Sequence, residues 1–254
     1  MMKTRPIVIA HRGASELAPE NTLAAFERGW QAGADGVECD VRMTADCEII
    51  CFHDADTQRV AGESLLVANH SFEDLRKLDV GAWKGPVFLG TRIPLLSELL
   101  AKLPSEKQVF IEIKTGIEIL PCLIEVIEQS AVDLNRITVL AFDQEVVRKL
   151  KKARPDLQAY WLIDVGSNWL GRSKLKIETV LETLAQLKAD GLGLRCHSGI
   201  HRELVQNILE AGFRLNIWTV DEPMDARRYA SFGVSSITSN RPAFILDALG
   251  SARD

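Results

Sequence analysis

The feature that most constrains the fold is an alternation of short apolar runs with helical patterns along nearly the whole chain. Apolar runs of about four to eight residues are typical of buried strands, and the patterns between them have the period of amphipathic helices. Strands that alternate with helices predict a parallel sheet with crossover helices. The predicted strands lie at 6–10, 36–41, 48–52, 109–113, 137–142, 157–163, 191–194, 214–218 and 236–238.

Capping residues mark the expected limits of several helices. Thr22 precedes an apolar stripe that stops at Gly33, and Asp143 precedes a later helical pattern. Another helix is expected to end at Gly233, and a last one to start at Pro242. Thr and Asp side chains accept hydrogen bonds from the first helical N–H groups, Pro suits the first turn, and Gly suits the left-handed turn after a helix.

The number of strand–helix units favours a closed barrel over an open sheet. About eight units in 254 residues is the size expected of an α/β (β/α)8 TIM barrel. The first strand is followed by neither Gly-x-Gly-x-x-Gly nor a Walker loop, which disfavours a nucleotide-binding sheet. We therefore predict that residues 1–254 form a single TIM-barrel domain. Two segments interrupt the alternation: 55–93 is too long for a simple connection, and 166–174 is expected to be a polar loop.

Composition excludes several other classes of protein. Hydrophobic residues make up 46% of the chain, as in ordered globular proteins, and no apolar run approaches the roughly 20 residues that span a bilayer. A net charge of −5 with no basic block argues against nucleic-acid binding. The five cysteines form no Cys-x-x-Cys pair, and the first apolar stretch is too short for a signal peptide. We expect a cytoplasmic protein without integral membrane association, and a homo-oligomer stays open.

Charged and histidine side chains gather where the early apolar runs stop. Glu38 and Asp40 lie two positions apart in one predicted strand, so both point to the same face. In a barrel, inward positions near the carboxyl ends of the strands meet at the catalytic face. The residues at these ends are His11, Arg12, Glu38, Asp40, His53, Glu112 and Lys114.

The three carboxylates of this set favour a metal site. Glu38, Asp40 and Glu112 would raise each other's pKa values or require a cation if they were brought together away from water. Mg²⁺ or Ca²⁺ suits such oxygen ligands better than zinc, because no thiolate accompanies them. Spacing alone leaves a second interpretation open, in which the carboxylates only form ion pairs with Arg12 and Lys114.

Together these residue types indicate phosphoryl-transfer chemistry. A metal and two cationic side chains can neutralise a phosphodiester and the charge that develops on it. His11 and His53 can serve as general base and general acid, because the unperturbed histidine pKa lies near working pH. Taken singly, each histidine is better explained as a structural imidazole, and it is their shared position with the charged residues that favours a site.

The same residues lie within an ordered set of motifs that resembles the glycerophosphodiester phosphodiesterase family. The similarity runs from about residue 7 to residue 242, and the set is much more specific than any single motif. The motifs are IAHRGA (9–14), PENTLAAF (19–26), GADGVECDV (33–41), FHD (52–54), IPLL (93–96), IEIK (111–114), WTV (218–220) and TSNRP (238–242).

The resemblance implies a TIM barrel with a small insertion after the second strand, at about 55–94. It implies hydrolysis of glycerophosphodiesters, such as glycerophosphocholine or glycerophosphoethanolamine, to sn-glycerol 3-phosphate and an alcohol. In the mechanism usually drawn for the family, the glycerol 2-hydroxyl attacks first and water then opens a cyclic phosphate. The residues to which the resemblance assigns roles are Glu38, Asp40 and Glu112 for one divalent metal, Mg²⁺ or Ca²⁺, His11 and His53 for acid–base catalysis, and Arg12 and Lys114 for the phosphate.

Several assignments stay open at this level. The sequence does not show which histidine is the acid. Trp218 is predicted to form an apolar wall for the glycerol, with core packing as the competing interpretation, and Asn21 is either a helix cap or part of the site. A lysophospholipase D, a sphingomyelinase-D-like enzyme and a non-catalytic binding barrel are the alternative functions. The last is the least favoured, because every expected catalytic position is present.

Overall fold

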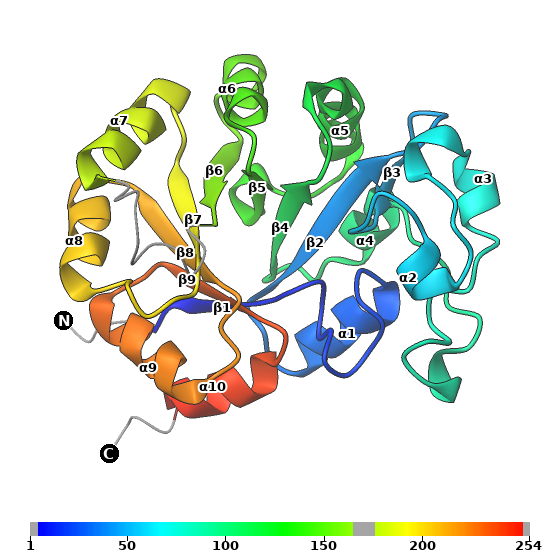
Figure 1. Cartoon of the computed structure of the whole chain (residues 1–254), viewed down its shortest axis with the longest axis horizontal. Coiled ribbons are helices and arrows are strands. Elements are labelled where there is room, and N and C mark those ends of the chain that lie inside the picture. Colours follow the sequence, from blue (N-terminus) through cyan, green and yellow to red (C-terminus); the bar gives the residue numbers. More distant parts are fainter. Residues whose placement is uncertain (1–4, 165–175, 251–254) are drawn as a thin grey trace.

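The computed structural model describes residues 5–164 and 176–250, so the predicted polar loop at 166–174 lies outside the described residues. Within the described residues, eight parallel strands form a closed ring, because β1 pairs with β9 on one side and with β2 on the other. Helices lie outside the strands (Figure 1). The predicted (β/α)8 TIM barrel is therefore confirmed.

Each predicted strand is present, and the differences lie at the strand ends. β2 runs to Met43, two residues beyond its predicted end, and Phe142 falls just outside β5. β3 (Ile49–Cys51) is not a barrel strand, since it pairs antiparallel with β2 as a hairpin return. The barrel strands are β1 (Ile7–Ala10), β2 (Gly36–Met43), β4 (Gln108–Ile113), β5 (Ile137–Ala141), β6 (Gln158–Ile163), β7 (Gly191–Arg195), β8 (Arg214–Trp218) and β9 (Ser236–Ser239).

The helices begin and end close to the predicted caps. The Thr22 hydroxyl accepts a hydrogen bond from the Ala25 N–H, Asp143 caps a later helix, and Gly233 follows another with a φ of 91°. The helices among the described residues are α1 (Leu23–Gln31), α2 (Gln58–Ala61), α3 (Phe72–Leu75), α4 (Leu96–Lys102), α5 (Leu120–Gln129), α6 (Gln144–Ala153), α7 (Ile177–Leu187), α8 (Arg202–Glu210), α9 (Pro223–Phe232) and α10 (Pro242–Gly250). None of them combines the length and apolar character needed to cross a membrane.

The barrel interior is filled with side chains and is tightly packed. The rings of Phe110 and Tyr160 meet edge to face at a centroid distance of 6.0 Å. Gly193 on β7 has no side chain, and the Leu162 side chain occupies the space that one would fill. A Cβ atom at Gly193 would lie 2.3 Å from Cδ2 of Leu162. The interior cluster of buried apolar residues consists of Ile9, Phe110, Leu140, Tyr160 and Leu162.

The segment 55–94 forms a small unit beside the barrel, at the right edge of Figure 1. It contains α2 and α3, and the Ser71 hydroxyl caps α3 by accepting a hydrogen bond from the Asp74 N–H. The unit packs against Ile50 and Phe52 of the hairpin return and forms one apolar cluster with them, to which it contributes Val60, Val67, Leu75, Val80 and Ile93. The insertion after the second barrel strand is thus present. That the whole chain forms one domain stays a prediction.

Candidate active site

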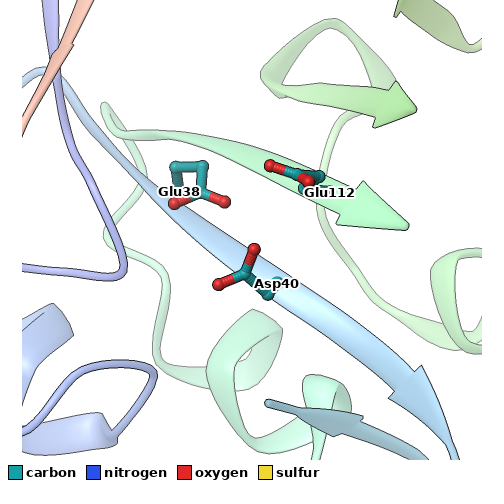
Figure 2. A group of neighbouring side chains, drawn as sticks. All are labelled: Glu38, Asp40 and Glu112. Atoms are coloured by element: carbon teal, nitrogen blue, oxygen red, sulfur yellow. The ribbon is translucent and has the colours of Figure 1, made fainter. Parts of the chain in front are cut away.

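Three carboxylates from two neighbouring strands meet at the carboxyl ends of the barrel strands. Glu38 and Asp40 extend from β2 and Glu112 from β4, as Figure 2 shows, and Asp40 is the register partner of Glu112. One oxygen from each side chain lies within 4.8 Å of the other two, and all three residues are buried. The predicted cluster is therefore present in the fold.

The donor set fits a divalent cation. Glu38 Oε1 is buried and has no hydrogen-bond partner among the described residues, and Asp40 Oδ1 is buried with no hydrogen bond but with the Lys114 ammonium at 3.3 Å. Ionised carboxylate oxygens can only accept, so such atoms require a proton, a donor or a cation. Hard oxygen ligands that converge in this way are those that Mg²⁺ and Ca²⁺ prefer.

Two cationic side chains flank the carboxylates. Arg12 Nε lies 3.0 Å from Asp40 Oδ2, and the Arg12 backbone N–H donates to Glu38 Oε2 at 2.8 Å. Lys114 Nζ lies 3.3 Å from Asp40 Oδ1 and 2.5 Å from Glu112 Oε1. The ion pairs considered from the sequence therefore exist beside the carboxylate cluster, and the two interpretations do not exclude each other.

The three carboxyl groups differ in charge state. Burial would raise the pKa of Asp40, but Arg12 and Lys114 outweigh burial and lower this pKa to about 2. Burial and the Asp40 charge raise the pKa of Glu112 to about 7, and the same two causes, with Glu112 added, raise that of Glu38 well above its usual value. Asp40 is thus a permanent anion, whereas Glu38 and Glu112 ionise readily only when a cation offsets the repulsion.

His11 is held in one tautomer by a chain of hydrogen bonds. A carboxylate only accepts, so Asp221 Oδ2 must receive the amide N–H of Asn240, at 2.7 Å. The Asn240 carbonyl oxygen therefore faces His11 Nδ1, also at 2.7 Å, and Nδ1 carries the proton. His11 Nε2 is left as an acceptor, 3.9 Å from Glu38 Oε2. Burial and the neighbouring Arg12 lower the pKa of His11 to about 4, so the ring is neutral at pH 7.

His53 has an ionised partner instead of an amide. Its Nδ1 lies 2.7 Å from Asp54 Oδ1, and Asp54 also accepts from Arg59 Nε at 2.6 Å. Burial lowers the pKa of His53, whereas Asp40 and Asp54 oppose the shift by stabilising the imidazolium. The two histidines therefore differ in environment, one bound to a neutral amide and the other to a carboxylate.

A cavity of about 490 Å³ connects these groups at the mouth of the barrel. Trp218 lines it and meets Phe142 edge to face, with ring centroids 5.6 Å apart. Trp218 Nε1 has no hydrogen-bond partner among the described residues. The residues that line the cavity are His11, Arg12, His53, Glu112, Lys114, Phe142, Arg195, Cys196, Trp218 and Thr219.

The structure decides between the two roles that the sequence left open for Asn21. Thr22, and not Asn21, caps α1, and the Asn21 side chain binds Asp40 with two hydrogen bonds. The spacing of His197 and His201 resembles a metal motif, but each Nδ1 accepts a nearby backbone N–H. His201 thereby caps α8.

Sequence reasoning missed Asn240, Asp221, Asp54 and Arg195 as site residues. Asn240 follows the last barrel strand and Arg195 ends β7, so the strand-end argument that found His11 would have found both if extended to the later strands. The one sequence signal for Asp54 was its position next to His53. Asp221 had no signal, because it contacts the site through Asn240.

Comparisons with known proteins agree with this geometry. The profile of the glycerophosphoryl diester phosphodiesterase family matches residues 11–244. A glycerophosphodiester phosphodiesterase of Caldanaerobacter subterraneus is 34% identical over 97% of this chain and 98% of its own. The structure of an Oleispira antarctica phosphodiesterase in complex with the product sn-glycerol-3-phosphate is 26% identical, covers 97% of each chain and superposes with a TM-score of 0.84.

The family match, together with the acidic, cationic and histidine side chains at the carboxyl ends of the barrel strands, identifies a phosphodiester hydrolase. The chain belongs to the glycerophosphoryl diester phosphodiesterase family, whose members hydrolyse glycerophosphodiesters.

Proposed function

We propose that the protein hydrolyses glycerophosphodiesters, such as glycerophosphocholine or glycerophosphoethanolamine, to sn-glycerol 3-phosphate and an alcohol in a reaction that depends on one divalent cation. The observation that carries the proposal is that two histidines, two cationic side chains and Glu112 line one cavity, and that Glu112 belongs to a cluster of three buried carboxylates. The similar Oleispira structure, which contains sn-glycerol 3-phosphate, supports this product.

Glu38, Asp40 and Glu112 would hold the cation, which we expect to be Mg²⁺ or Ca²⁺. When bound, the cation would offset the negative charge of the phosphate oxygens and the negative charge that develops in the transition state. Arg12 and Lys114 lie within ion-pair distance of Asp40 and line or border the cavity, so they are placed to bind the remaining phosphate oxygens. Their positive charge offsets the net charge of −5 of the whole chain locally.

His11 and His53 would divide the proton transfers. His11 has a free acceptor at Nε2 and is neutral at pH 7, so we assign it the role of general base toward the attacking hydroxyl. We assign His53 the role of general acid toward the leaving alcohol, because Asp40 and the adjacent Asp54 carboxylate offset part of the lowering of its pKa by burial. Trp218 and Phe142 form an apolar wall that we assign to the carbon atoms of the glycerol.

The proposal is tested by incubating the purified protein with glycerophosphocholine and glycerophosphoethanolamine, with Mg²⁺, Ca²⁺ or EDTA. Release of sn-glycerol 3-phosphate is followed with a coupled dehydrogenase. Turnover that persists in EDTA, or full activity of His11→Ala or Glu112→Ala, would overturn the proposal. A parallel reaction with lysophosphatidylcholine distinguishes the lipid-directed alternatives. A cytoplasmic location stays a prediction.

A further inference from the structure

Arg195 lines the cavity but has no part in the steps proposed above. It is the last residue of β7, and β7 is four strands from β2 in either direction around the ring. Arg195 therefore lies across the mouth of the barrel from the strand that carries Glu38 and Asp40. The cavity extends from one side to the other, because its lining includes both Arg12 and Arg195.

Among residues 5–164 and 176–250, the guanidinium of Arg195 has one ion-pair partner and N–H donors that are not used. Its Nη1 forms an ion pair with Asp164 Oδ2 at 2.7 Å, and 57% of the side chain is exposed. A guanidinium has five N–H donors in a rigid fork that matches carboxylate and phosphate groups. A second anion can therefore bind Arg195 while the ion pair with Asp164 is kept.

The surroundings of Arg195 favour an anion over a cation. Asp164 pairs with Arg195, but among the described residues that line the cavity Glu112, three strands away on β4, is the one acidic residue. The cationic residues of this lining are Arg12, Lys114 and Arg195. Arg195 is the register partner of Trp218 on β8, so the two side chains leave adjacent strand ends. A substrate with its glycerol against Trp218 would thus present its next group to Arg195. A volume of about 490 Å³ is that of a typical ligand site, with room beyond a glycerophosphate.

We propose that Arg195 is a specificity-determining residue that favours glycerophosphodiesters with a second anionic group, one glycerol unit from the phosphate that is cleaved. This inference rests on the proposed function, because it uses the phosphate and glycerol positions assigned there. A substrate whose Trp218-bound glycerol carries no further group, such as glycerophosphocholine, gains nothing from this contact.

The test compares two substrates that differ in one phosphodiester group. Bis(glycerophospho)glycerol has a second phosphodiester one glycerol away from either bond that can be cleaved, and glycerophosphoglycerol lacks it. With the central glycerol of the first compound against Trp218, the leaving alcohol is a terminal glycerol, so release of glycerol is measured for both compounds. We expect a higher kcat/KM for the first compound in the unaltered protein. Arg195→Gln should lower the ratio of the two kcat/KM values by about threefold to tenfold, the size of a partly exposed charge-assisted contact. Arg195→Lys should retain part of the preference.

Arg148→Gln is the matched control, since Arg148 is 51% exposed and paired with Glu145 on α6, outside the cavity. It should leave the ratio unchanged. The preference of the unaltered protein should weaken with added salt, because exposed charges are screened. An unchanged ratio in Arg195→Gln, with both compounds hydrolysed, would overturn this proposal alone. Failure of the unaltered protein to hydrolyse either compound would overturn the proposed function as well.

Discussion

Asn21 holds Asp40 by two hydrogen bonds, one to its side chain and one to its backbone. Asn21 Nδ2 donates to Asp40 Oδ2 at 2.8 Å, and Asn21 Oδ1 accepts from the Asp40 N–H at 3.0 Å. Asn21 is buried and has a φ of 56°, in the left-handed region that asparagine tolerates better than most residues. The residue thus orients a carboxylate of the proposed metal site from the loop before α1.

The first prediction concerns this contact. Asn21→Gly removes both hydrogen bonds without straining the backbone, since glycine adopts a positive φ freely. We expect affinity for Mg²⁺ or Ca²⁺, measured by titration calorimetry, to fall about 10–100-fold, as for other residues that orient metal ligands. Asn207→Ala on α8 is the control and should bind the cation normally. Equal affinities in both variants would show that Asn21 does not position Asp40 for a cation.

The second prediction is a pH-dependent stabilisation by the cation. In its absence, the raised pKa of Glu112 means that its contribution to stability is present below its unfolded value of 4.5 and is lost as pH rises through about 7. A bound cation removes that repulsion and binds only the ionised carboxylates. The increase in Tm on adding Mg²⁺ or Ca²⁺ should therefore be larger at pH 8 than at pH 5.

The size of this effect follows from mass action. A cation at 100 times its Kd adds about 2.7 kcal/mol to the free energy of unfolding. Scanning fluorimetry with and without the cation at the two pH values measures the difference. Glu112→Gln should reduce the shift at pH 8. Equal shifts at both pH values would contradict the assignment of the cluster as a metal site.

The third prediction separates catalysis by His11 from its positioning by Asn240. His11→Ala should lower kcat by about 10²–10⁴-fold, the usual contribution of general acid–base catalysis. Asn240→Ala should lower kcat by less, with KM nearly unchanged, because the ring remains but loses its fixed tautomer. Since the pKa of His11 is about 4, the acidic limb of kcat/KM should lie well below the ordinary histidine pKa of 6.5. If the acidic limb of kcat/KM lies near pH 6.5 and persists in His11→Ala, the limb reports the titration of another group.

The fourth prediction concerns packing inside the barrel. Gly193→Ala places a methyl group against Leu162 and should lower the free energy of unfolding by about 1–3 kcal/mol, as overpacked cores do. Urea unfolding measures the change. Gly250→Ala is the control, because a Cβ there meets no atom within 4 Å. Gly193→Ala combined with Leu162→Ala should lose less free energy of unfolding than the two single variants lose in total, since the clash disappears.

The elements of the fold follow from local sequence patterns. Glu38 and Asp40 share a face because side chains alternate along a strand with a period of two, which requires no knowledge of the partner strand. Thr22 and Asp143 mark helix starts because a cap acts within a few residues. Such short-range rules predicted the barrel strands and the cluster of β2.

The tertiary structure decided which strand ends meet. Asp40 faces Glu112 through the register of β2 with β4, and His11 contacts Asn240 across 229 positions of the chain. The contact of His11 with Asn240 depends on ring closure, because β9 pairs with β1, and ring closure also places Arg195 opposite β2. The contact of Asp40 with Glu112 depends on the pairing of β2 with β4, and packing of the loop before α1 against β2 makes Asn21 an orienting residue instead of a cap. No local period encodes these contacts. The sequence by itself determined which chemical groups stand at the strand ends, and the closed barrel decided their partners, because only the complete ring brings distant strand ends into contact.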